Sequence, residues 1–120
     1  MKAGDRYTMS HVVKESETAE VLGSGGLPVY STPSMICLME LTAFKLAESK
    51  GFQTVGTRVD ISHIRACRPG TELTSLAEIV AVEGRKITYK VSVSDSAGLI
   101  GEGEHERFVI DPERFMSKIK

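Results

Sequence analysis

The sequence predicts an α+β fold in which one long helix packs against one antiparallel sheet. Residues 32–51 carry the start and stop signals of a helix, and from residue 54 onward apolar and polar residues alternate. This alternation is the period of a half-buried strand. Short turns separate the later strands, so neighbouring strands are expected to run antiparallel. One buried helix combined with such a sheet is a two-layer α+β arrangement.

The chain before the helix is predicted to form one strand and a loop. Residues 4–13 are the expected strand, and a polar connection follows it. The run Gly23–Gly26 predicts a flexible loop. Too little chain precedes this loop to form a separate domain, so we expect residues 1–120 to form a single domain.

The predicted helix is bounded by residues that favour helix ends. Thr32 suits the N-cap, Pro33 the first helical position, and Gly51 the residue just past the end. The first half of the helix is apolar on nearly every side, which predicts burial. Cys37 lies in this half and is expected to pack in the interior as a small hydrophobic residue.

The strand after the helix has a period of two, which predicts its two faces. One face is expected to carry Val55, Thr57, Val59, Ile61 and His63, and the other Gly56, Arg58, Asp60 and Ser62. Three further strands are predicted at 72–82, 86–94 and 99–110, with turns at 83–85 and 95–98 and a short C-terminal helix capped by Asp111. The sheet's free edge predicts side-by-side pairing into a homodimer.

Composition excludes several classes of function. The net charge is −1 and the basic residues are dispersed, so neither nucleic acid nor an anionic membrane is an expected partner. No apolar stretch approaches the roughly 20 residues that span a bilayer. The two cysteines form no disulfide framework, and we expect a cytoplasmic protein. The three histidines lack ligand spacing, so no metal or other cofactor is predicted.

Three residues are candidates for chemistry. Glu40 lies in the apolar half of the helix, where a carboxylate is paired, protonated or functional, unless it occupies a solvated stripe. His63 is expected to face the helix, and therefore Glu40, although a core histidine bonded to a backbone carbonyl would fit as well. Thr32 lies beside the free N–H groups of the helix start, which can hold an oxyanion, but it can equally be a simple cap. His105 lacks such a setting and is expected in a solvated or interfacial charge cluster.

Several blocks, in one order along the chain, resemble the fluoroacetyl-CoA-thioesterase-like group of hot-dog proteins. The blocks are Tyr30–Pro33 through Met39-Glu40, Gly56-Thr57 through Ser62-His63, Glu83–Arg85, and the tail residues Gly101, Gly103, His105, Glu106, Arg107 and Ile110. The resemblance implies a hot-dog fold, a sheet wrapped around one central helix, in a homodimer. It also implies hydrolysis of acyl-CoA thioesters by a Thr, Glu and His set at Thr32, Glu40 and His63. Gly56 takes the place of a glycine near the bound acyl group.

On this reading Glu40 acts on water as a general base or attacks the thioester as a nucleophile, with His63 shuttling the proton. A straight helix separates Thr32 from Glu40 by about 12 Å, so either the chain bends at Thr32 or a second subunit completes the site. Arg58, Arg65 and Arg68 are candidates for holding the phosphates of coenzyme A, although an arginine is often only a solvated surface residue. The glycine run suggests an open mouth and a larger acyl group.

Other functions also fit the sequence. An acyl-thioester dehydratase or hydratase on the same fold also uses a histidine and an acidic residue. A non-catalytic acyl-CoA-binding module would bind the ligand without turnover. A structural dimer would leave Glu40 solvated.

Overall fold

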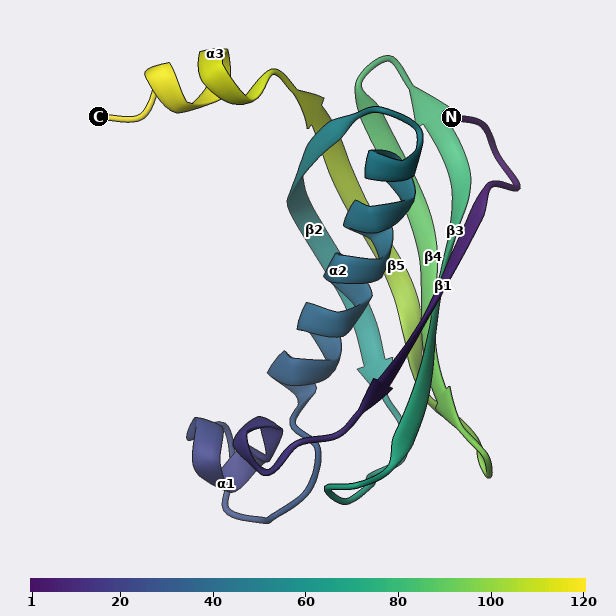
Figure 1. Ribbon diagram of the computed structural model, residues 1–120, viewed down its shortest axis with the longest axis vertical. Coiled ribbons are helices and arrows are strands. Elements are labelled where there is room, and N and C mark those ends of the chain that lie inside the picture. Colours follow the sequence, from purple (N-terminus) through teal and green to yellow (C-terminus); the bar gives the residue numbers. More distant parts are fainter.

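The computed structural model describes residues 1–120 and confirms the predicted α+β fold. Figure 1 shows the long helix α2 lying lengthwise against one face of a curved five-stranded sheet. The strands are β1 (Arg6–Val12), β2 (Gln53–His63), β3 (Glu72–Glu83), β4 (Lys86–Asp95) and β5 (Gly98–Ile110). The helices are η1 (Glu15–Glu17), α1 (Ala19–Leu22), α2 (Thr32–Ser49) and α3 (Pro112–Ser117).

The strand order in the sheet is β1-β3-β4-β5-β2, and all pairs are antiparallel. The edge strands are therefore β1 and β2. In Figure 1, α3 stands off the body of the molecule next to the end of β5. None of the helices is long and apolar enough to cross a membrane.

The core lies between α2 and the sheet. Burying each large apolar side chain there contributes about 1.5–3 kcal/mol. The buried apolar residues of α2 are Met35, Leu38, Met39, Ala43, Leu46 and Ala47, and those of β3, β4 and β5 are Leu73, Ala77, Ile79, Ile87, Tyr89, Val91, Val93 and Ile100.

The helix start differs from the prediction by one residue. Ser31, in extended backbone conformation, is the N-cap, and its hydroxyl accepts the N–H of Ser34. Thr32 is the first helical residue, so its prediction as the cap was wrong. Because Ser31 performs the capping, the hydroxyl of Thr32 is free for another partner. The predicted end is confirmed, since Gly51 has a φ of 89° just past the helix.

Burial of α2 is one-sided in this chain. The sheet covers one face of the helix, and Cys37 lies on an uncovered part with its side chain exposed. The prediction that Cys37 packs in the core was therefore wrong for the single chain. An apolar sequence predicts burial but does not say which neighbour provides it.

A β-bulge at Thr57 changes the predicted faces of β2. Gly56 pairs with Arg107 and Arg58 pairs with Glu106, so Thr57 is the additional residue. Before the bulge the even-numbered residues Thr54 and Gly56 face α2. After it the odd-numbered residues face α2, including His63. The prediction that Val55 and Thr57 share a face with His63 was wrong, because one inserted residue reverses the alternation.

Candidate functional site

Thr32 and His63 form a pair at the start of α2. Thr32 Oγ1 lies 2.8 Å from Nδ1 of His63, which is the last residue of β2. Burial lowers the pKa of His63 below its ordinary value of 6.5, so the imidazole is neutral at pH 7. A neutral imidazole bonded to a hydroxyl can take its proton, which is the arrangement used in nucleophilic and general-base catalysis.

A cavity of about 320 Å³ opens beside this pair. It is lined by residues 29–33 and 63–66, together with Ala19 and Ser24. The ring of Tyr30 packs edge-on against His63, with centroids 6.4 Å apart and planes at 76°. The volume of this cavity falls in the range of small-molecule binding sites.

The first turn of α2 presents one free backbone donor to this region. The N–H of Ser34 is bonded to the hydroxyl of Ser31, the N–H of Met35 to the Ser31 carbonyl, and Pro33 has no N–H. The N–H of Thr32 makes no hydrogen bond within the chain. A donor at a helix start can stabilise a developing oxyanion.

Glu40 lies two turns further along the same helix. The helix is continuous from Thr32 to Ser49, so the rise separates Thr32 from Glu40 by about 12 Å. The sequence left two ways of bringing Thr32 and Glu40 together, a bend of the chain at Thr32 or a second subunit. The chain does not bend at Thr32, so the first of these is removed. Glu40 Oε2 lies 3.5 Å from Nη1 of Arg107, with 43% of its side chain exposed. The carboxylate is thus neither deeply buried nor free in solvent. It pairs with Arg107 instead of the expected His63.

Arg107 is a site residue that the sequence reasoning missed as a functional group. It lies on β5, is 7% exposed, and donates Nε to Thr54 Oγ1 at 2.8 Å and Nη2 to the Thr54 carbonyl at 3.1 Å. Burial lowers the pKa of its guanidinium, while Glu40 favours the charged form. The available signal was the period of β5, which turns residues 105 and 107 toward α2. A charged residue at an inward position is costly unless it is paired.

Gly56 leaves the space that Glu40 occupies. A Cβ atom there would lie 2.6 Å from Glu40 Oε2 and 3.2 Å from both Arg107 Nη1 and His105 Cε1. A side chain at this position would therefore displace the carboxylate. The predicted residues form two groups within one chain: Thr32 with His63, and Glu40 with Gly56.

Comparison with known proteins identifies the family of this chain. Residues 13–113 match the family of fluoroacetyl-CoA-specific thioesterases. The fluoroacetyl-CoA thioesterase of Streptantibioticus cattleyicolor is 33% identical over 100% of this chain and 93% of its own length. This chain belongs to the fluoroacetyl-CoA-specific thioesterase family.

Solved structures support the family assignment. A variant of the fluoroacetyl-CoA thioesterase in complex with acetyl-CoA superimposes with a TM-score of 0.92 at 32% identity, covering 98% of this chain and 96% of that one. A hypothetical protein of Thermus thermophilus, a thioesterase superfamily member, gives a TM-score of 0.86 at 25% identity, with 96% and 88% covered. The resemblance inferred from the sequence blocks is confirmed, as is the hot-dog fold.

His105 does not lie in a solvated charge cluster, so that prediction was wrong. It is 1% exposed, faces α2 from β5, and stacks on Tyr89 with centroids 5.9 Å apart. Its charged neighbours Glu104 and Glu106 point to the other face because strand residues alternate.

Two of the three arginines considered for coenzyme A, Arg58 and Arg65, are engaged within the chain. Arg58 lies on the outer face of the sheet, 3.3 Å from Asp60, 3.6 Å from Glu104 and 3.8 Å from Glu106. Arg65 lines the cavity beside His63 but is ion-paired with Asp95. The role of both in substrate binding stays a prediction, and the position of Arg65 suits it better.

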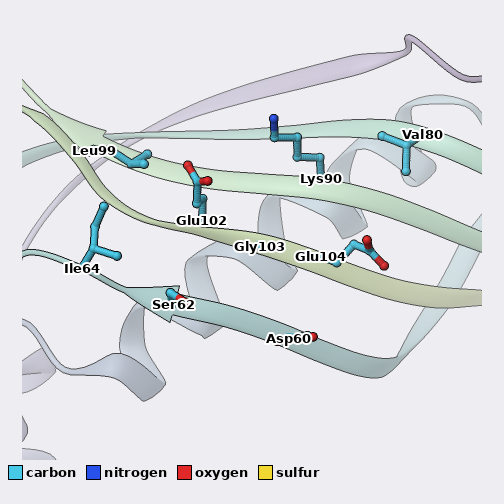
Figure 2. Close-up of a pocket in the computed structure, with 9 residues that line it drawn as sticks. All are labelled: Asp60, Ser62, Ile64, Val80, Lys90, Leu99, Glu102, Gly103 and Glu104. Atoms are coloured by element: carbon cyan, nitrogen blue, oxygen red, sulfur yellow. The ribbon is translucent and has the colours of Figure 1, made fainter.

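A second cavity, of about 610 Å³, lies on the outer face of the sheet. Figure 2 shows its lining residues on the strands, apart from Ile64, which follows β2, and the helix lies behind the sheet. Asp60, Glu102 and Glu104 surround it, and Lys90 is its one basic residue. An excess of carboxylates repels the phosphates of coenzyme A, so this cavity is unsuited to that ligand.

Proposed function

We propose that this chain hydrolyses a short or medium acyl-CoA thioester to the free acid and coenzyme A. Membership of the thioesterase family supports this proposal. The observation that carries it is the hydrogen bond between Thr32 and a neutral His63 at the edge of a small cavity. A hydroxyl, a base and a free backbone N–H at one point are the groups that acyl transfer requires.

In the proposed reaction the thioester carbonyl lies beside Thr32. Glu40 either removes a proton from the attacking water or attacks the carbonyl itself, giving a mixed anhydride that water then cleaves. The Thr32 N–H holds the oxygen on which negative charge develops, and the Thr32 hydroxyl joins it when His63 Nδ1 is the donor of the hydrogen bond between them. When the C–S bond breaks, the thiolate of coenzyme A leaves and takes up the proton given up by the water that is consumed, for which His63 is the nearest shuttle.

This mechanism needs Glu40 near Thr32, and within one chain they are too far apart. We therefore propose that a second copy of the chain supplies Glu40. The strand β2 is paired on one side only, by β5, and its other edge is free. Antiparallel pairing of two β2 strands near Val59 would set the His63 end of one copy opposite the Gly56 end of the other. Glu40 accompanies Gly56, so it would meet the Thr32–His63 pair of the other subunit.

The activity is tested by measuring free thiol release from a panel of acyl-CoA thioesters. Wild type, Glu40→Gln and His63→Ala are compared, with thermal unfolding as the check on folding. We expect the rate to fall about 100- to 10,000-fold in each variant. No thiol release by wild type from any ester, together with a raised melting temperature on adding coenzyme A esters, would instead identify an acyl-CoA-binding module.

The shared site is tested by mixing the two inactive variants. A mixed dimer of Glu40→Gln and His63→Ala subunits has one site with both groups intact and one with neither. With random exchange half of the dimers are mixed, so about a quarter of the wild-type activity should return. A mixture that exchanges subunits and stays inactive would place all the reacting groups within one chain.

A further inference from the structure

The buried histidine on β5 makes contacts that the proposed reaction does not use. We propose that His105 is a positioning residue that sets the orientation of Arg107 and, through it, the position of the Glu40 carboxylate. This inference rests on the proposed role of Glu40 in thioester hydrolysis.

The hydrogen bonds of His105 require one tautomer. Arg107 Nη1 can only donate, so His105 Nε2, 3.2 Å away, is the acceptor. The carbonyl of Arg58 can only accept, so His105 Nδ1, 2.8 Å away, carries the proton. Both contacts therefore assign the proton to Nδ1. Stacking on Tyr89, at an interplanar angle of 27°, fixes the plane of the ring.

The ring of His105 binds the one guanidinium nitrogen of Arg107 that Thr54 leaves free. Thr54 engages Nε and Nη2, leaving Nη1 and its two N–H groups. Nη1 lies 3.2 Å from His105 and 3.5 Å from Glu40. When one N–H points at His105, the planar group directs the other toward the carboxylate. His105 thus adds a third hydrogen bond to a guanidinium that Thr54 already holds by two, and it fixes Nη1 beside the Glu40 carboxylate.

The surroundings keep His105 neutral, as the acceptor role requires. Burial, which is the largest effect, and the charge of Arg107 lower the pKa of the imidazole, while the hydrogen bond to the Arg58 carbonyl, Glu40 on α2 and Glu106 on β5 act in the opposite direction. Tyr89 on β4 stays uncharged, because burial raises the pKa of its phenol to about 12. From β2 the carbonyl of Arg58 faces the ring. Protonation would place an N–H where Arg107 needs an acceptor and would release Nη1.

Two substitutions separate the two hydrogen bonds of the ring. The amide of Asn reaches the position of Nδ1 and can still donate to the Arg58 carbonyl, but offers Arg107 nothing. The amide of Gln reaches the position of Nε2 and can still accept from Arg107, but loses the bond to Arg58. Wild type, His105→Asn and His105→Gln are compared by steady-state kinetics on the best acyl-CoA substrate, with melting temperatures in parallel.

We expect His105→Gln to retain kcat within about three-fold at pH 8. His105→Asn should lose about 10- to 100-fold in kcat with little change in KM, because a misplacement of a reacting group by about 1 Å can cost about 100-fold. His105→Gln should also lose one protonation step from the acid side of the pH–rate profile. Near-wild-type kcat in His105→Asn would overturn the proposal. So would an equal loss in both variants that follows their melting temperatures, because the role would then be structural.

A second measurement tests the proposal even if the variants do not fold or the wild type has no thioesterase activity. Nitrogen NMR of the wild-type histidines should show His105 as the neutral Nδ1–H tautomer near pH 7. The opposite tautomer, or a protonated ring, would refute the positioning role whatever the activity. If the expected tautomer is found but the protein hydrolyses no acyl-CoA, the proposed function is rejected. Positioning for catalysis is then rejected with it, and only the hydrogen bond between His105 and Arg107 is supported.

Discussion

Replacing Gly56 with alanine should damage catalysis more than folding. The added methyl would lie 2.6 Å from Glu40 Oε2, where ordinary contact begins at 3.4 Å. The carboxylate must therefore retreat by roughly 0.8 Å, because the repulsion at the shorter distance exceeds any gain from contact. The backbone itself tolerates alanine, since Gly56 does not have a positive φ.

The expected size of the effect follows from these distances. A displacement of about 1 Å in a reacting group can cost about 100-fold, so kcat should fall roughly 10- to 100-fold. The carboxylate is the far end of a flexible side chain and can move. The groups of Arg107 and His105, each 3.2 Å from the methyl, need to yield only slightly. Overpacking of this kind should lower the free energy of unfolding by about 1–3 kcal/mol.

The assay is thiol release at saturating acyl-CoA, combined with urea unfolding. Gly26→Ala is the matched control, because a Cβ at Gly26 meets nothing within 4 Å and its φ is not positive. The control should keep wild-type kcat and stability. A folded Gly56→Ala protein with wild-type kcat would refute the reasoning, since it would show that the position of Glu40 beside Gly56 does not matter for the reaction.

Three further predictions concern pH, packing and substrate size. The pKa values of His63 and His105 are lowered by folding, so below pH 6.5 the unfolded chain binds more protons. The free energy of unfolding should therefore be steady above pH 6.5 and decrease as the pH falls further; urea titrations at pH 7.5 and 5.5 that give equal stability would contradict this. Gly103→Ala would place Cβ 2.2 Å from the Asp60 carbonyl oxygen, and because backbone must then move, melting curves should show a loss of about 3 kcal/mol or more. The run Gly23–Gly26 borders the cavity through Ser24, so acyl groups longer than acetyl should be accepted, and a sharp preference for acetyl in a chain-length series would exclude an open mouth.

Much of the fold follows from local sequence patterns. The start and stop signals around α2 and the period of the strands predicted the elements to within one or two residues, because capping and strand alternation are short-range effects. Two short helices, η1 and α1, were not predicted in the polar connection, where no periodic pattern marks them.

The errors arose where a local pattern depends on a distant partner. The bulge at Thr57 is defined by the pairing of β2 with β5, about 50 residues away, so the alternation of β2 alone gave the wrong face for Val55. Similarly, Cys37 lies in an apolar run, but only the packed structure decides which side of α2 the sheet covers.

By itself, the sequence determined the fold class, the family and the identity of Thr32, Glu40 and His63 as candidates, because these depend on residue type and spacing. Only the tertiary structure decided how they group. It joined Thr32 to His63 and placed Glu40 with Arg107 and Gly56 in a second group, two turns further along α2. The physical reason is that side-chain contacts between α2, β2 and β5 are set by strand register and helix rise, which no single segment of the chain contains.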